Sequence, residues 1–342
     1  MKFQSSENRR EFIKYLTALT AGIVIPISVS GNNSEQHDRL GKVLPKRMLG
    51  KTGLEVTMLG VGGYHIGWTS EKDAQEVIEA ALEGGIRFFD SAESYGPHTS
   101  EIRYGKYLVP HFRDDIFLMT KTYSTSPEQA RKHLEESLDR MKTDHLDLWQ
   151  LHSLESQKDV EDRITEGILE VMMEAKESGK TRHIGFTGHA DPRAHARMLE
   201  RTRDNPLFET IQMPVNVVDY NYKYSFIKQV LPLALEGNMG VLAMKTLADG
   251  RFFADKRMGD EHVWSSDDPV VPGRLSMRDA LYFAWSLPIS VLITGAENAK
   301  FIKEKIELAK GFASLSEEEQ LALVAKVVDL AEKGEVEYYK NV

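Results

Sequence analysis

Eight apolar segments with strand character alternate with helix-like segments along this 342-residue chain. The strand candidates are 58–62, 86–90, 115–121, 146–152, 182–187, 210–214, 240–245 and 289–294. This alternation is typical of a parallel sheet covered by helices, and eight units are the number that closes a (β/α)8 barrel. The alternative, a doubly wound open sheet, requires a glycine fingerprint after the first strand. The string Gly60-Val-Gly62-Gly63 lacks the third glycine at that spacing, so we expect one (β/α)8 TIM barrel.

Two additions flank the expected barrel. Residues 46–58 read as a β-hairpin, with two short runs around a glycine-containing turn. Residues 316–333 read as a helix that begins with a capping box at Ser316 and has no strand after it. We therefore expect an appended C-terminal helix, a barrel domain over 45–342, and a mobile polar leader over 31–44.

The first 30 residues form a separate segment. The string NRREFIK precedes an apolar run, YLTALTAGIVIPISVS, which is too short for a spanning helix of about 20 residues. Ser28 and Ser30 supply the small residues of a cleavage site. The segment resembles a twin-arginine export signal. This implies transport by the twin-arginine machinery to the periplasm and no stable membrane anchor after cleavage. A cytoplasmic protein with an N-terminal arm is the alternative.

Composition excludes several classes of function. A net charge of −9 argues against a broad nucleic-acid surface. The chain has no cysteine, which excludes disulfides, thiolate zinc sites and cysteine nucleophiles. A metal-dependent barrel hydrolase needs ligands on several strand ends, and only His152 and His189 qualify. We therefore expect no metal site.

Four residues indicate chemistry at one end of the barrel. Asp90, Lys121 and His152 each close a strand candidate, and the three positions are spaced 31 residues apart. One βα unit takes roughly 30 residues, so these side chains should meet at the carboxyl ends of three consecutive strands, where barrel enzymes carry their active sites. Tyr95 follows Asp90 in the string DSAESYG. A phenol, an ammonium, a carboxylate and an imidazole gathered there predict a proton-transfer site.

The strings that surround these four residues resemble the aldo-keto reductase family over residues 46–313. They include RMLGKTGLEVTMLGVGG, DSAESYG, ESLDRMKTDHLDLWQLHS, GKTRHIGFTG and IQMPVNVVD. The resemblance implies a (β/α)8 barrel that binds a nicotinamide cofactor without a Rossmann fold. It also implies an NAD(P)-dependent oxidoreductase that transfers hydride between the nicotinamide and a carbonyl or alcohol substrate, such as an aldehyde, a ketone or a sugar. The alternative is a nicotinamide-binding, redox-sensing or regulatory subunit of the same fold with little turnover.

The resemblance also assigns roles to the four residues. Tyr95 would be the general acid that protonates the carbonyl oxygen. A free phenol has a pKa near 10, so we expect the Lys121 cation to lower the pKa of Tyr95. Asp90 would hold Lys121 charged and oriented, and His152 would donate a hydrogen bond to the substrate oxygen.

Cofactor and substrate contacts are carried over in the same way. The expected cofactor residues are Gly63, Tyr64, Asp90, Thr187, Gln212, Met244, Lys245, Leu247 and Asn298, with Gln212 binding the nicotinamide carboxamide. Gly188 stands where the family usually has Asn. Gly295 and Phe301 stand where NADP-preferring members carry basic residues, which leaves the choice between NADP and NAD open. The family resemblance favours NADP. The expected substrate pocket residues are His65, Trp68, His98 and Trp264, and 249–275 reads as a lid or binding loop.

Export and hydride transfer together carry a further implication. No pool of reduced nicotinamide exists outside the cytoplasm, whereas the twin-arginine route carries folded proteins. We therefore expect a cofactor that is loaded before transit and held tightly, reduced by one substrate and reoxidised by another.

Overall fold

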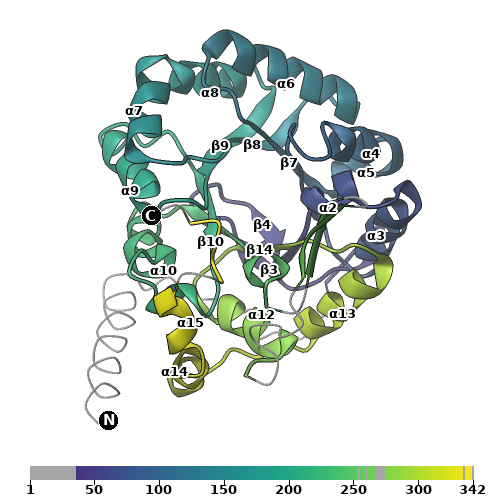
Figure 1. Ribbon diagram of the computed structural model, residues 1–342. Helices are drawn as coiled ribbons and strands as arrows, with labels where there is room; N and C mark the ends of the chain where they lie inside the picture. The colour runs from purple at the N-terminus through teal and green to yellow at the C-terminus, as the bar shows by residue number, and fades with distance from the viewer. Residues whose placement is uncertain (1–35, 253–254, 259–260, 266–273, 334–335, 341–342) are drawn as a thin grey trace.

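The computed structural model describes residues 36–252, 255–258, 261–265, 274–333 and 336–340, and its centre is a closed barrel of eight strands inside a ring of helices (Figure 1). The barrel strands are β5 (Leu59–Gly62), β6 (Phe88–Asp90), β7 (Phe117–Thr122), β8 (Leu146–Leu151), β9 (Thr181–Thr187), β10 (Thr210–Pro214), β11 (Gly240–Met244) and β14 (Val291–Thr294). Every neighbouring pair is parallel, and β14 pairs with β5 to close the ring. The predicted (β/α)8 barrel is confirmed.

Helices cover the outside of the barrel after each strand. They are α2 (Gly63–Trp68), α3 (Glu71–Glu83), α4 (Thr99–Tyr107), α5 (Val109–Phe112), α6 (Pro127–Met141), α7 (Gln157–Thr165), α8 (Ile168–Glu177), α9 (Pro192–Arg201), α10 (Phe226–Gln229), α11 (Leu231–Glu236), α12 (Met277–Ser286) and α13 (Ala299–Lys310), with 3-10 turns η1 (Arg113–Asp115), η2 (Asp219–Asn221) and η3 (Ala248–Gly250). Helix α6 shows how the sequence starts them, since Ser126 accepts a hydrogen bond from the backbone of Gln129 ahead of Pro127.

The predicted N-terminal hairpin is present and closes one end of the barrel. It consists of β3 (Lys46–Met48) paired antiparallel with β4 (Glu55–Thr57). Leu49 and Val56 are buried against side chains from the barrel interior, namely Phe88, Phe117, Met119, Leu148, Leu242, Val291 and Ile293. Gly50 is needed at the contact, because it has a φ of +53° and a Cβ there would lie 2.1 Å from the backbone N of Gly240. The strand ends at the other side of the barrel are thereby left for the functional site.

The segment expected to be a mobile leader differs from that expectation over its described part, residues 36–44. Two short strands, β1 (His37–Asp38) and β2 (Gly41–Lys42), pair with each other. The carboxylate of Asp38 lies 2.6 Å from the guanidinium of Arg87, a side chain only 7% exposed. A charge buried to that degree requires a partner, so the ion pair holds this segment against the barrel wall.

The appended C-terminal helix differs as well. It begins with the predicted capping box at Ser316 but divides into α14 (Glu317–Ala325) and α15 (Val328–Lys333). The side-chain amide of Asn221 donates to the carbonyl oxygen of Val324 at 3.1 Å. This bond competes with continuation of the helix, and the next amides turn back to carbonyls three residues earlier.

The long segment between β11 and α12 contains a hairpin that was expected to be a loop. Strands β12 (Asp255–Met258) and β13 (Glu261–Ser265) pair antiparallel with one irregularity in register. No helix of the described residues is long and apolar enough to cross a membrane. The predicted export signal, residues 1–30, lies outside the described residues.

Candidate active site

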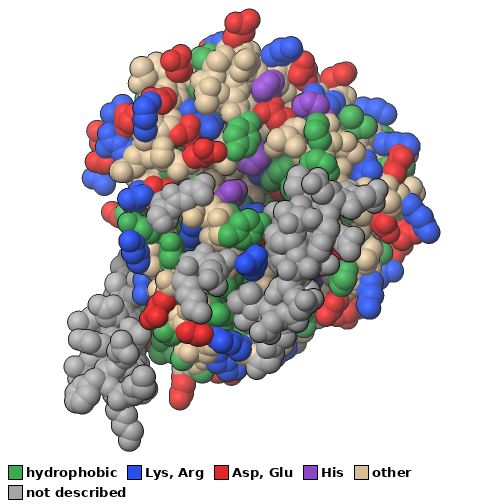
Figure 2. All heavy atoms as spheres, in the orientation of Figure 1, with side chains coloured by type: hydrophobic (Ala, Val, Ile, Leu, Met, Phe, Trp, Pro, Cys, Tyr) green, Lys and Arg blue, Asp and Glu red, His purple; other side chains and the backbone are tan. Residues whose placement is uncertain are grey.

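The structure brings the four predicted catalytic residues together at the carboxyl ends of β6, β7 and β8. Asp90 is the last residue of β6, Lys121 is the last but one of β7, and His152 follows β8 directly. Tyr95 lies in the turn that leads from β6 to α4. In the view of Figure 2, histidine side chains lie near the centre of the face at which these strands end.

Lys121 contacts both Asp90 and Tyr95 and so links the members of this group. Its ammonium pairs with Asp90 Oδ1, donates to the backbone carbonyl of Ser91 at 2.7 Å and reaches the hydroxyl of Tyr95 at 3.4 Å. The Lys121 and Asp90 side chains are 1% and 3% exposed. Burial raises the pKa of Asp90 and lowers the pKa of Lys121, and their mutual attraction opposes both changes. The backbone N–H of Gly63 gives Asp90 a further hydrogen bond.

The pKa of Tyr95 moves opposite to the prediction. Burial raises it well above the usual value for a phenol, and the Asp90 carboxylate raises it further. Lys121 does not reverse the change, because Asp90 compensates its charge at closer range than Tyr95. Tyr95 therefore holds its proton near neutral pH and is a hydrogen-bond donor beside an ammonium that can stabilise a phenolate once the proton has left.

His152 is a neutral imidazole near pH 7. Burial lowers its pKa well below the usual value, and the positive charge of Lys121 adds to this effect. Its ring meets the ring of Tyr95 edge-on at 5.7 Å and the ring of Tyr123 at 5.0 Å. A neutral imidazole carries one N–H donor, so this geometry suits a group that orients an uncharged oxygen next to the Tyr95 hydroxyl.

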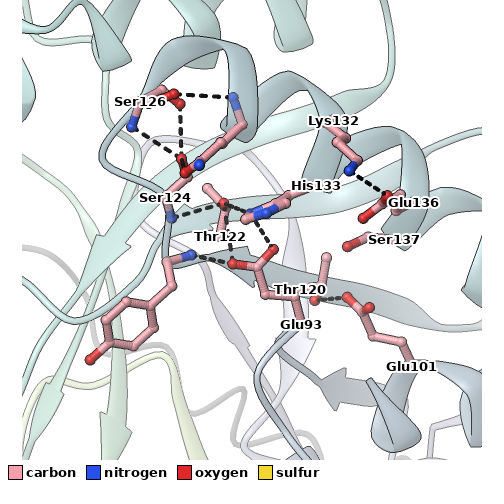
Figure 3. Close-up of polar contacts among 12 residues, drawn as sticks. Glu93, Glu101, Thr120, Thr122, Ser124, Ser126, Lys132, His133, Glu136 and Ser137 are labelled. Atoms are coloured by element: carbon pink, nitrogen blue, oxygen red, sulfur yellow. Dashed lines mark hydrogen bonds and ion pairs between the residues drawn. The ribbon is translucent and has the colours of Figure 1, made fainter. Parts of the chain in front are cut away.

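A second layer, missed by the sequence reasoning, supports the Tyr95 turn (Figure 3). Glu93 accepts a hydrogen bond from the backbone N–H of Tyr123 at 2.6 Å, and its other oxygen lies 2.8 Å from Nδ1 of His133 in α6. Burial raises the pKa of this carboxyl, and the Tyr123 amide opposes the change. The contact ties the Tyr95 turn to the end of β7. The sequence did offer one signal for this contact, namely an acidic residue, Glu93, two positions before Tyr95 in the string DSAESYG.

A second buried carboxylate extends this layer toward α4 (Figure 3). Glu101 is fully buried and accepts from the hydroxyl of Thr120 at 2.6 Å and from the guanidinium of Arg140 at 2.7 Å. The bonds connect α4, β7 and α6 behind the catalytic group. The helix that follows Tyr95 is thereby fixed against the strand that carries Lys121.

The expected nicotinamide contacts lie on the next strands. Thr187, the last residue of β9, is paired in register with Gln212, the middle residue of β10, and both are buried. Among the described residues the side-chain oxygen of Gln212 has no hydrogen-bond partner. A buried amide oxygen of this kind is costly without a donor, and the NH2 group of a nicotinamide carboxamide would supply one. Met244 closes the neighbouring β11, and the residues present fit such a cofactor.

Two departures from the family pattern have steric reasons. A Cβ at Gly188 would lie 2.5 Å from the carbonyl oxygen of Leu154, so the Asn expected there has no room. A Cβ at Gly295 would lie 2.0 Å from Nδ1 of His65. His65, expected in the substrate pocket, therefore packs against the end of β14.

The remaining residues expected to bind the cofactor lie on several different elements, and one of them has a structural role instead. Lys245 has a φ of +56° and pairs with Asp249 at 3.0 Å, and Leu247 directly precedes η3. The side-chain oxygen of Asn298 accepts from two backbone amides at the start of α13, so it serves as a helix cap. Tyr64, at the start of α2, meets the ring of Tyr95 edge-on at 5.7 Å.

The residues expected in the substrate pocket lie on different elements around Tyr95 and His152. Trp68 is partly exposed at the end of α2, with its ring 6.3 Å from that of Tyr64. His98 is exposed at the start of α4, in a left-handed conformation. Trp264 lies in β13, and the placement of its side chain is outside what the structure describes. Tyr123, which the sequence reasoning missed, is 42% exposed and stands next to His152.

Comparisons with known proteins agree with this geometry. Among curated proteins, the L-galactose dehydrogenase of Arabidopsis thaliana is 31% identical over 218 residues, which cover 60% of this chain and 66% of that protein. The 6-dehydroglucose reductase of Novosphingobium aromaticivorans is 27% identical over 285 residues, covering 77% of this chain and 90% of that protein. Among solved structures, aldo-keto reductase AKR11C1 from Bacillus halodurans shares the fold with a TM-score of 0.68 at 24% identity, covering 83% of this chain and 96% of that one.

A scan against protein-family models matches residues 58–333 to the Aldo/keto reductase family. The matched range contains all eight barrel strands and the four candidate catalytic residues, Asp90, Tyr95, Lys121 and His152. The chain belongs to the aldo/keto reductase family.

Proposed function

We propose that this protein is a nicotinamide-dependent oxidoreductase that interconverts a carbonyl group and an alcohol. Two features of the same barrel carry the proposal. The Lys121 ammonium reaches the Tyr95 hydroxyl at 3.4 Å, and the buried amide oxygen of Gln212 in β10 lacks a partner among the described residues. Hydride transfer to a carbonyl requires a proton donor and a binding place for the nicotinamide carboxamide, and these residues fit both needs.

Each residue has a distinct part in the reaction. When bound, the reduced nicotinamide supplies a hydride to the carbonyl carbon. Tyr95 donates its hydroxyl proton to the carbonyl oxygen, which completes the alcohol. Lys121 stabilises the phenolate left behind, and Asp90 keeps Lys121 in place. His152, neutral near pH 7, donates a hydrogen bond that orients the substrate oxygen.

The substrate class that we propose is a sugar or a sugar-like aldehyde or ketone. The rings of Tyr64, Trp68 and Tyr123 provide apolar surfaces around the reacting position. The hydroxyl of Tyr123 also donates to Glu155 at 3.3 Å, which places polar groups for substrate hydroxyls at the rim. Two relatives, L-galactose dehydrogenase and 6-dehydroglucose reductase, are named for sugar substrates. For the cofactor we propose NADP, with NAD as the alternative, and retention of the bound nucleotide.

Steady-state turnover tests this proposal. NADPH or NADH oxidation is followed with a panel of aldoses, aldehydes and ketones, and nucleotide reduction with sugar alcohols, for the wild type and Tyr95→Phe. We expect turnover with at least one sugar and none above background in the variant. Tight nucleotide binding without turnover on any substrate would favour the regulatory alternative, and absence of nucleotide binding would refute both.

We further propose that residues 1–30 direct export by the twin-arginine route. Support comes from the NRREFIK string and the short apolar run after it. Cell fractionation of the full chain and of a variant with Arg9 and Arg10 changed to Lys is the test. Periplasmic wild type with retained variant is the expected result, and equal cytoplasmic distribution of both would overturn it.

A further inference from the structure

The C-terminal segment Val336–Lys340 lies over the mouth of the barrel, and its contacts are unusual for a chain end. In Figure 1 the yellow end of the chain runs inside the helix ring beside β10. The side chains of Glu337, Tyr339 and Lys340 are buried. Charged side chains buried to this degree require partners, so the contacts of this segment show what holds it in place.

A buried ion network fastens the segment. The ammonium of Lys340 lies 2.5 Å from Asp219 and 2.6 Å from Glu337, and all three side chains are at most 2% exposed. Asp219 also accepts from the backbone of Phe226 and from the hydroxyl of Ser225. Removal of one member of such a network leaves an uncompensated buried charge, so the segment is bound firmly to the loop after β10.

The same segment holds the loops that follow β9, β10 and β11. Asn216, after β10, donates to Glu337 at 2.8 Å and to the Tyr339 hydroxyl at 3.2 Å. The Tyr339 ring stands 5.6 Å from the ring of His189, after β9, and 5.3 Å from the ammonium of Lys245, after β11. These three loops follow the strands that carry Thr187, Gln212 and Met244.

The loop after β11 has an unfavourable backbone conformation that contacts from other segments must hold in place. Lys245, Ala248 and Asp249 have φ values of +56°, +49° and +60°, in the left-handed region that disfavours residues with a Cβ. Such a conformation persists only where neighbours hold it. The Tyr338 hydroxyl supplies one contact, donating to Asp249 at 2.5 Å, and Asp249 in turn pairs with Lys245.

We propose that Val336–Lys340 is a strap that completes the cofactor site, and that the Lys340–Asp219–Glu337 network sets how slowly the nicotinamide nucleotide leaves. The inference rests on the proposed function, because it assigns these residues to the same cofactor. The strap residues are positioning residues: they act through the loops after β9, β10 and β11.

The test is the rate of nucleotide release. Protein loaded with NADPH is mixed with an excess of NADP+, and the loss of nicotinamide fluorescence is followed for the wild type, Lys340→Met and Lys340→Arg. The exposed Lys326→Met is the matched control. We expect release at least about tenfold faster in Lys340→Met, recovery toward the wild-type rate in Lys340→Arg, and no change in Lys326→Met.

Tyr338→Phe keeps the test valid if Lys340→Met fails to fold. Tyr338 is 41% exposed, so the loss of its hydroxyl leaves the fold intact while it removes one contact that holds Asp249, and we expect release about threefold faster. Wild-type protein that binds no nucleotide would refute the proposed function itself. Tight wild-type binding with unchanged release in both Tyr338→Phe and Lys340→Met would refute only the strap.

Discussion

Substitution of Lys121 by Met should destabilise the protein because it leaves the buried Asp90 carboxylate without its cation. The Asp90 carboxylate is 3% exposed and pairs with the Lys121 ammonium. Without Lys121 its known remaining support is the backbone N–H of Gly63. A buried carboxylate in that position takes up a proton instead of remaining charged.

The magnitude follows from the cost of that proton. To protonate a carboxyl with a usual pKa of about 3.9 at pH 7 costs about 4 kcal/mol, which agrees with roughly 3–5 kcal/mol for breaking a buried ion pair. Burial raises the folded-state pKa of Asp90, and the charge and hydrogen bond of Lys121 oppose that rise. Without Lys121 the opposition is lost, so the folded variant binds more protons at Asp90 than the folded wild type or the unfolded chain. Stability therefore falls as pH rises, and the deficit of Lys121→Met should grow by up to about 1.4 kcal/mol per pH unit between pH 5 and pH 7.

Urea unfolding at pH 5, 6 and 7 measures this deficit. The double variant Asp90→Asn, Lys121→Met removes the orphaned charge, and we expect it to recover most of the lost stability while turnover stays absent. The exposed Lys132→Met is the control, with an expected change within about 0.5 kcal/mol. A double variant no more stable than Lys121→Met, or a deficit independent of pH, would show that the pairing argument is incorrect.

Substitutions at three further residues test other parts of the account. Glu93→Ala should lower kcat about tenfold with an unchanged cofactor Kd, because the Tyr123 amide loses its acceptor, and Glu93→Gln should restore most of it; equal kcat in all three proteins would exclude a positioning role. Burial lowers the pKa of Lys305 from 10.5 to about 8, so stability should rise by about 3 kcal/mol between pH 8 and pH 10.5. Unfolding of Lys305→Met should lack that rise. Burial lowers the pKa of His195 from 6.5 to about 4, so about 3 kcal/mol of stability should be lost as pH falls through that range. Unfolding of His195→Leu in acid should be less sensitive to pH by that amount, and an unchanged acid limb would contradict the burial argument.

The local pattern of the sequence predicts the barrel, and it predicts that the four candidate catalytic residues meet at one end of it. Most residues of the barrel strands β6, β7 and β8 are apolar and buried, and Asp90, Lys121 and His152 are polar residues at or near the ends of these strands. Strand ends in a closed parallel barrel converge on one face, so the spacing alone brings these side chains together.

Contacts between distant segments could not be predicted in this way. Lys340 and Asp219 are 121 positions apart, and no local periodicity links them. The division between α14 and α15 depends on Asn221, about a hundred positions earlier. The direction of the Tyr95 pKa depends on burial and on how fully Asp90 compensates Lys121, and both are properties of the folded site.

The most direct test of the account is a single turnover of protein already saturated with NADPH. The wild type and Tyr95→Phe are mixed with a substrate found in the steady-state panel, and nicotinamide absorbance is followed in time. If Tyr95 donates the proton, hydride transfer should slow by at least about a hundredfold, while the Kd for NADPH stays within about twofold of wild type. Transfer at the wild-type rate in Tyr95→Phe would contradict the assignment of this site.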